Sequence, residues 1–150
     1  MKVGILGFAH AHVNAYCTQW RQRGELAVEP TAGWDRDDVR LDRAVEQHGV
    51  EPYASAKELL AGDVEAVVVA SETSLHAELV GQAAAGKAVI LQKPMDLTLE
   101  DADRITAAVD AAAVPFIMAW QMRVDPENLQ IKALLDAGAL GRIYQIRRRH

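Results

Sequence analysis

The chain has 150 residues, of which 50% are hydrophobic, 25% charged and 5% aromatic. This length is enough for one well-buried hydrophobic core and too short for two full ones. The 16 basic and 21 acidic residues give a formal net charge of −5, which argues against a protein that binds nucleic acid or an anionic membrane.

The N-terminal segment and the cysteine content favour a reducing compartment. The apolar run at residues 3–8 is too short for the core of a signal peptide. No run approaches the roughly 18 apolar residues of a transmembrane helix. The single cysteine, Cys17, excludes an internal disulfide bond. We therefore expect a soluble, cytoplasmic protein.

Short apolar runs alternate with longer helical patterns, which predicts parallel βαβ units. Four runs, at residues 3–6, 66–70, 88–91 and 116–119, are apolar almost without interruption, as expected of strands that are covered by helices on both faces. The sequence therefore predicts an α/β fold with a doubly wound parallel sheet. The expected strands are residues 2–7, 27–34, 66–70, 87–91, 115–120 and 141–149.

Helical patterns follow the first strands. Residues 13–23 have helical character after the first strand, and residues 37–48 follow the second. Ser55 and Glu58 have the spacing of a capping box, in which the two side chains satisfy the free amides of the first helical turn. We expect this short helix to end near Gly62.

Two further helices carry capping signals. Thr73 or Ser74 is expected to cap a helix that ends at a left-handed Gly86. Thr98 is expected to cap an alanine-rich helix that ends before Pro115.

The C-terminal part begins a new unit. Asp125 and Pro126 provide an N-cap and a first-turn proline for a helix that Gly138 closes. Residues 143–149 then alternate like a half-exposed strand, with nothing after them to pair with it. We expect residues 1–122 to form one domain and residues 123–150 to start a second, truncated one.

The first turn between a strand and a helix contains the segment Gly7-Phe8-Ala9-His10-Ala-His12. A turn that binds a dinucleotide usually has three glycines, which allow a tight bend, close approach of the pyrophosphate and close helix packing. Only the first, Gly7, is present, and Ala9 and His12 stand at the other two positions. The helix N-terminus still attracts phosphate through its free amides. His12 either crowds the pyrophosphate or donates a hydrogen bond to it.

Asp35 follows the second strand, where a carboxylate can bind both ribose hydroxyls of NAD and would repel the 2′-phosphate of NADP. The neighbouring Arg36 can stack on adenine or pair with a phosphate, so NADP is not excluded. Alternatively, Asp35 is the N-cap of the helix at residues 37–48.

Gln92 and Lys93 directly follow a buried strand, so Lys93 lies at the carboxyl edge of the sheet, where ligands bind in open α/β folds. It is either a functional ammonium group or a solvated loop residue. His76, one turn into the helix after the strand at residues 66–70, lies on the same side and faces either a cofactor or solvent. The simpler interpretation of Glu72 and Thr73 is that they accept hydrogen bonds from the free amides at the start of that helix.

Gln121 and Arg123 follow the last strand of the first domain, where they can reach hydroxyl or carboxylate groups of a substrate. The simpler interpretation of Arg123 is an ion pair with Asp125 or Glu127. His10, His12 and His76 suggest a metal-dependent lyase or hydrolase, but the first two are only two residues apart and no third ligand is near in sequence. We therefore expect no metal.

The order of these motifs resembles the N-terminal half of the Gfo/Idh/MocA family of NAD(P)-dependent oxidoreductases. The most diagnostic block is Gly86-Lys87-Ala-Val-Ile-Leu-Gln92-Lys93-Pro94. The similarity covers nearly the whole chain. The other matching stretches are residues 2–7 with the following turn, 34–36, 53–55, 58–60, 64–70 leading to His76, 123–126 and 138–143.

The resemblance implies a Rossmann domain, followed in the family by an α/β domain that supplies substrate contacts and usually the oligomer interface. It implies hydride transfer between a nicotinamide and a sugar, inositol or related polyol. Lys93 would be the catalytic lysine that stabilises the developing alkoxide. Its usual aspartate and histidine partners would lie beyond residue 150, so this chain would be an inactive fragment. Gln92 stands where the family usually has glutamate, and Glu72 where it often has proline.

We therefore expect an NAD-preferring dehydrogenase whose cofactor domain is this chain. The alternative is a Rossmann-like binding or regulatory protein without catalysis, which the reduced number of glycines in the first turn would favour. The residues expected to contact the cofactor are Gly7, Phe8, Ala9, His10, His12, Asp35, Arg36, Ala70, Ser71, Thr73, His76, Gln92 and Lys93.

Overall fold

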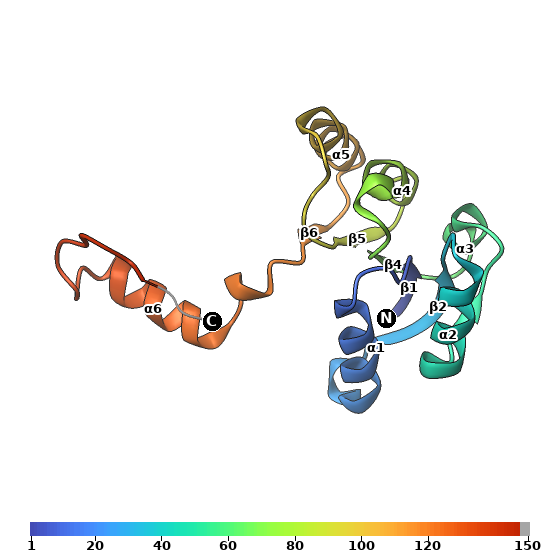
Figure 1. Ribbon diagram of the computed structural model, residues 1–150, viewed down its shortest axis with the longest axis horizontal. Helices are drawn as coiled ribbons and strands as arrows, with labels where there is room; N and C mark the ends of the chain where they lie inside the picture. Colours follow the sequence, from blue (N-terminus) through green and yellow to red (C-terminus); the bar gives the residue numbers. More distant parts are fainter. Residues whose placement is uncertain (148–150) are drawn as a thin grey trace. The chain divides into compact units, whose positions relative to one another are not determined.

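The computed structural model describes residues 1–147 (Figure 1). Within that range the chain forms a six-stranded parallel sheet in the order β3-β2-β1-β4-β5-β6, which confirms the predicted doubly wound α/β fold. The strands are β1 (Lys2–Leu6), β2 (Glu29–Trp34), β3 (Glu51–Pro52), β4 (Ala66–Val69), β5 (Ala88–Leu91) and β6 (Phe116–Met118).

Helices cover both faces of this sheet. One hydrophobic cluster joins alternate strand residues to α1 (His12–Gln22) and α2 (Asp38–His48). The other cluster joins the opposite strand faces to α3 (Ala56–Ala61), α4 (His76–Ala83) and α5 (Leu99–Ala112). Because successive side chains of a strand point to opposite faces, the apolar β1 and β4 sequences can serve both clusters at once.

The central strands are buried as predicted, but the last one is not. All of β4 and all of β1 after Lys2 are buried. The prediction that residues 116–119 form a strand covered on both faces is wrong, because β6 pairs only with β5 and is the sheet edge in the described residues. Ile117 is 53% exposed. The two-residue β3 was missed, because Glu51 and Pro52 carry no apolar pattern.

Two predicted helix caps of the first domain are confirmed by hydrogen bonds. The Ser55 side chain accepts from the amide of Glu58 at the start of α3. Thr98 accepts from the amide of Asp101 at the start of α5. In each case the cap lies three residues before the donor, so the local sequence was sufficient to identify it.

The helix after β4 starts differently from the prediction. Neither Thr73 nor Ser74 caps it, because residues Thr73–Leu75 form a 3-10 turn and the side chain of Asp96 accepts from the amide of Ala77 instead. The expected left-handed Gly86 is also wrong, since α4 ends at Ala83 and Gly86 has no positive φ. The cap comes from a distant segment that no local pattern indicates.

Backbone contacts divide the chain into two compact units, Met1–Ala119 and Trp120–His150, whereas the sequence suggested a boundary after residue 122. The second unit contains a 3-10 turn (Gln121–Arg123) and α6 (Pro126–Asp136), whose N-cap Asp125 accepts from the amide of Asn128 as predicted. The strand expected at residues 141–149 does not form within the described part, because residues up to 147 have no paired partner strand. Residues 148 and 149 of that prediction lie outside the described residues.

No helix in the described part of the chain is long and apolar enough to cross a membrane.

Candidate cofactor site

The order of the strands reverses between β1 and β4, which puts a crevice at the carboxyl ends of these two neighbours. The turn after β1 is fixed there by two backbone hydrogen bonds. The amide of Gly7 donates to the carbonyl of Trp34 at 2.7 Å, and that of His10 donates to the carbonyl of Ala70 at 3.0 Å. The first turn is therefore held against the ends of β2 and β4.

Gly7 is required at this turn by its conformation and by its surroundings. Its φ is +91°, a value that side chains disfavour. A Cβ at Gly7 would lie 2.4 Å from Cα of the buried Ser71. The expected cofactor residues Ala70 and Ser71 thus lie directly behind the turn, and their backbone sets how closely the turn can approach the sheet.

The rest of the turn leaves amides and a helix end available. No side chain caps α1, and the amides of Ala9 and Ala11 have no hydrogen-bond partner among the residues that the structure describes. Ala9 and His12 are exposed. The imidazole of His12 lies against that of His10, with ring centroids 4.8 Å apart. An anion such as a pyrophosphate fits this end of α1, because its amides and the helix dipole favour negative charge.

Asp35 is the most heavily bonded polar group at this edge of the sheet. It is 3% exposed and accepts hydrogen bonds from the amides of Phe8 at 2.6 Å and Asp37 at 2.8 Å. The N-cap of α2 is Asp37, not Asp35, because the Asp37 side chain accepts from the amide of Arg40. The alternative interpretation of Asp35 as a helix cap is therefore wrong.

The guanidinium of Arg40 completes the environment of Asp35. Its Nη2 lies 2.7 Å from Asp35 Oδ1, and its Nε lies 3.1 Å from Oδ2. Burial alone would raise the pKa of Asp35, but Arg40 and the two amides outweigh it and keep this pKa below its usual value. Sequence reasoning missed Arg40, because nothing in its position within a polar helix indicates contact with a strand end five residues earlier.

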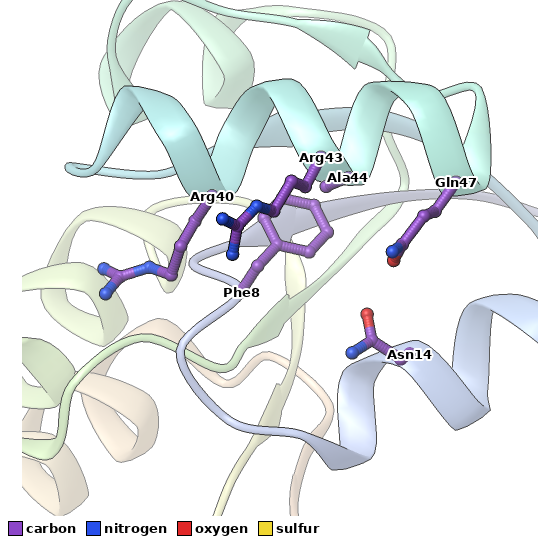
Figure 2. A pocket seen from close by; sticks show the side chains of 6 residues that line it. All are labelled: Phe8, Asn14, Arg40, Arg43, Ala44 and Gln47. Atoms are coloured by element: carbon purple, nitrogen blue, oxygen red, sulfur yellow. The ribbon is translucent and has the colours of Figure 1, made fainter.

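A pocket of about 260 Å³ lies between α1 and α2, beside this carboxylate (Figure 2). Phe8 forms part of its wall, and Arg40 extends from α2 away from Asn14 and Gln47. The expected Arg36 does not line it and is exposed. The residues lining the pocket are Phe8, Asn14, Arg40, Arg43, Ala44 and Gln47.

At the end of β5, Gln92 is fully buried and Lys93 is half-buried. The Gln92 side-chain nitrogen donates to the hydroxyl of Tyr16 on α1 at 2.7 Å, so this amide links the two elements that border the crevice. Burial lowers the pKa of His10, and the nearby charges of Lys93, His12 and His76 lower it further. The pKa of His10 therefore depends on groups from the first turn, α4 and the end of β5.

His76 is buried rather than solvated, with 1% exposure. Its Nδ1 lies 3.1 Å from the carbonyl oxygens of both Pro94 and Met95. Since carbonyls only accept, Nδ1 must carry the proton and donate to them. Together with Asp96, which bonds the amide of Ala77, His76 fastens the segment after Lys93 to the first turn of α4. The role that the structure shows for His76 is therefore to hold the segment after Lys93 against α4.

Replacing His76 by leucine is expected to destabilise the chain by about 1–2 kcal/mol, because the partly buried carbonyls of Pro94 and Met95 lose their donor. The variant His76→Asn should lose much less folding stability, since the asparagine Nδ2 can donate from nearly the position of the imidazole Nδ1. Urea unfolding of the two variants measures the difference. Equal losses in both variants would mean that imidazole packing, and not the hydrogen bond, holds this segment.

The remaining predicted residues fall into two groups. Thr73 is half-buried in the 3-10 turn after β4. Gln121 and Arg123 are exposed in the second unit, and no ion pair joins Arg123 to Asp125 or Glu127 in the described part of the chain. Within residues 1–147 no three His, Cys, Asp or Glu side chains gather in a way that could hold a metal ion.

Comparison with known proteins decides the family. Residues 1–119 match Gfo/Idh/MocA, an oxidoreductase family with an NAD-binding Rossmann fold. The chain belongs to this family. The resemblance inferred from the sequence motifs is thereby confirmed, and the matched range coincides with the first compact unit.

Individual Gfo/Idh/MocA relatives are dehydrogenases and reductases. The chain is 34% identical to a D-apiose dehydrogenase from Paraburkholderia graminis over 93% of its own length and 36% of that protein. Its fold matches the WlbA dehydrogenase from Bordetella pertussis, solved with NADH and UDP-GlcNAcA, at a TM-score of 0.86 and 28% identity, covering 96% of this chain and 43% of that one. A 3-ketoreductase from Actinomadura kijaniata, solved with NADP, matches with a TM-score of 0.75 and 29% identity over 95% of this chain and 44% of that one.

The chain therefore spans less than half the length of these Gfo/Idh/MocA relatives. It corresponds to their NAD(P)-binding domain.

Proposed function

We propose that this chain is the cofactor-binding part of an NAD-preferring dehydrogenase that acts on a CH–OH group of a sugar, inositol or similar polyol. The relatives support this substrate class, because their names specify D-apiose and inositol dehydrogenases. The cofactor domain alone lacks the second half of these relatives, so we infer that turnover requires the remainder of the intact protein.

The observation that carries the proposal is the grouping of distinct chemical functions at one edge of the sheet. Gly7 allows the first turn to lie within contact distance of Ser71, and the adjacent end of α1 offers unbonded amides to an anion. Asp35 follows β2 and accepts a hydrogen bond from the amide of Phe8 in the first turn. Lys93 follows β5, and its charge lowers the pKa of His10 in the same turn. A nicotinamide dinucleotide requires a ribose-binding carboxylate, a phosphate site and a catalytic group, and the ends of β2, β1 and β5 offer them in this order along the sheet.

We assign roles to the residues on this basis. The amides of the first turn would bind the pyrophosphate, and Asp35 would accept hydrogen bonds from the ribose hydroxyls of the adenosine half. The bound nicotinamide would supply the hydride chemistry. The Lys93 ammonium would donate a hydrogen bond to the reacting hydroxyl and stabilise the negative charge that develops on its oxygen. Gln121 and Arg123 would contact the substrate.

Calorimetric titration of NADH into the purified chain tests the proposal. We expect one site per chain with a dissociation constant in the micromolar range or below, since the fold already leaves the amides of Ala9 and Ala11 open to a pyrophosphate. Absence of binding at millimolar NADH and NADPH would contradict it. The matched control is Gly7→Ala, which should lose the heat of binding because the turn can no longer approach β4.

A further inference from the structure

Three charged side chains from separate elements meet at the adenosine end of the proposed site. Arg40 Nη2 lies 2.7 Å from Asp35 Oδ1 and 2.5 Å from Glu72 Oε1. These residues belong to α2, the end of β2 and the segment after β4. We call them the Asp35-Arg40-Glu72 cluster. Because the amide of Phe8 also bonds Asp35, the cluster adjoins the first turn.

The donors of Arg40 are already directed at carboxylates. Nε donates to Asp35, Nη2 donates to Asp35 and Glu72, and Nη1 lies 3.9 Å from Asp37 Oδ2. A guanidinium has five N–H donors in a fixed planar arrangement, and the three on Nε and Nη2 are used by Asp35 and Glu72, so an anion that binds through these two nitrogens must displace a carboxylate. Within the cluster, two carboxylates share one cation and leave a net negative charge.

Arg43 does not replace Arg40 in this position. Both arginines arise from α2 and line the pocket, but the guanidinium of Arg43 lies beside Phe8, while Arg40 extends away from Asn14 and Gln47 (Figure 2). No ion pair involves Arg43 among residues 1–147. Arg40 is therefore the basic side chain that Glu72 constrains, and Glu72 is half-buried beside it.

We propose that Glu72 is a specificity-determining residue that excludes the 2′-phosphate of NADP by occupying Arg40. This inference rests on the proposed function. NADP differs from NAD by a phosphate on the adenosine ribose, and an arginine near the end of the second strand is the usual partner of that phosphate. A phosphate monoester carries a charge of about −1.5 to −2 at neutral pH. Glu72 both engages the Arg40 guanidinium and repels this charge, while the neutral ribose hydroxyls of NAD meet no such repulsion.

Glu72→Gln removes this charge with little change in size. We expect the affinity for NADPH to rise about fivefold and that for NADH to stay nearly constant, because a charge interaction at a partly exposed site is worth about 1 kcal/mol. Glu72→Lys should move the ratio of the two dissociation constants further in the same direction. The control, Glu100→Gln on α5, removes an equal charge from an exposed position outside the cluster and should leave the ratio unchanged.

Dissociation constants for NADH and NADPH, measured by calorimetry on the purified wild-type chain and these variants at one ionic strength, decide the matter. A wild-type preference for NADH that shrinks in Glu72→Gln and Glu72→Lys supports the assignment. A preference for NADPH in the wild type, an unchanged ratio in both variants, or an equal change for both nucleotides overturns it. Binding of neither nucleotide by any of the proteins would instead overturn the proposed function, and this inference with it.

Discussion

Replacing Lys93 by methionine is expected to lower turnover of the intact protein on the order of 10²–10³-fold, because the group proposed to stabilise the developing negative charge is lost. Methionine retains the unbranched shape of the lysine stem, so the loss is mainly one of charge and hydrogen bonding. Binding of NADH should change little, since the proposed contacts of the adenosine half lie at the ends of β1 and β2.

Steady-state rates together with calorimetric NADH binding measure these two effects separately. Lys57→Met is the matched control, because Lys57 is an exposed residue on α3 and removes the same charge. Unchanged turnover in Lys93→Met would eliminate Lys93 as a catalytic residue. A protein without catalysis, the alternative function, would have no turnover to lose.

The same substitution has a second readout that does not depend on activity. The charge of Lys93 lowers the pKa of His10, after the larger effect of burial. Its removal should therefore raise the pKa of His10, which an NMR titration of the imidazole signals would detect. An unchanged His10 titration would mean that Lys93 lies too far from the first turn to act at this crevice.

Gly7→Ala is expected to destabilise the chain by about 2–5 kcal/mol, through backbone strain and steric overlap combined. The new methyl group would lie 2.4 Å from Cα of Ser71, and neither backbone can move easily because Ser71 is buried at the end of β4. NADH binding should be lost as well, since relief of the overlap would push the first turn away from the sheet.

Urea unfolding of Gly7→Ala against Gly81→Ala isolates the effect of position. Gly81 lies within α4, and a Cβ there would meet no atom within 4 Å. Alanine at this helical site should stabilise the chain by about 0.5–1 kcal/mol. If both substitutions gave the same change in unfolding free energy, the close approach of Gly7 to Ser71 would have no energetic role.

The elements of the fold were largely predictable because their signals are local. Continuous apolar runs identified β1, β4 and β5, and capping residues three positions before their donors identified the starts of α3 and α5. The exposure of β6 was not predictable in this way. Whether an apolar strand lies in the middle or at the edge of a sheet depends on its neighbours in space, and the run at residues 116–119 contains no information about them.

The same distinction separates the predicted and the missed parts of the site. The positions of Asp35 and Lys93 follow from the fold, because the carboxyl ends of parallel strands share one edge of the sheet. Their partners do not follow from it. Arg40 on α2 donates to Asp35, and Gln92 donates to the hydroxyl of Tyr16 on α1. Both contacts depend on how side chains pack between elements. The roles expected for the predicted residues in cofactor binding stay predictions until the titrations are done.

The attachment of the Lys93 segment to α4 has a consequence for its dynamics. The His76 side chain donates to the carbonyls of Pro94 and Met95, and the Asp96 side chain accepts from the amide of Ala77, so hydrogen bonds run from each segment to the other. Neither can open without breaking the bonds of the other, which makes them one cooperative unit of local unfolding. Amide hydrogens in the first turn of α4 should accordingly exchange with solvent only as fast as the loop beside them detaches.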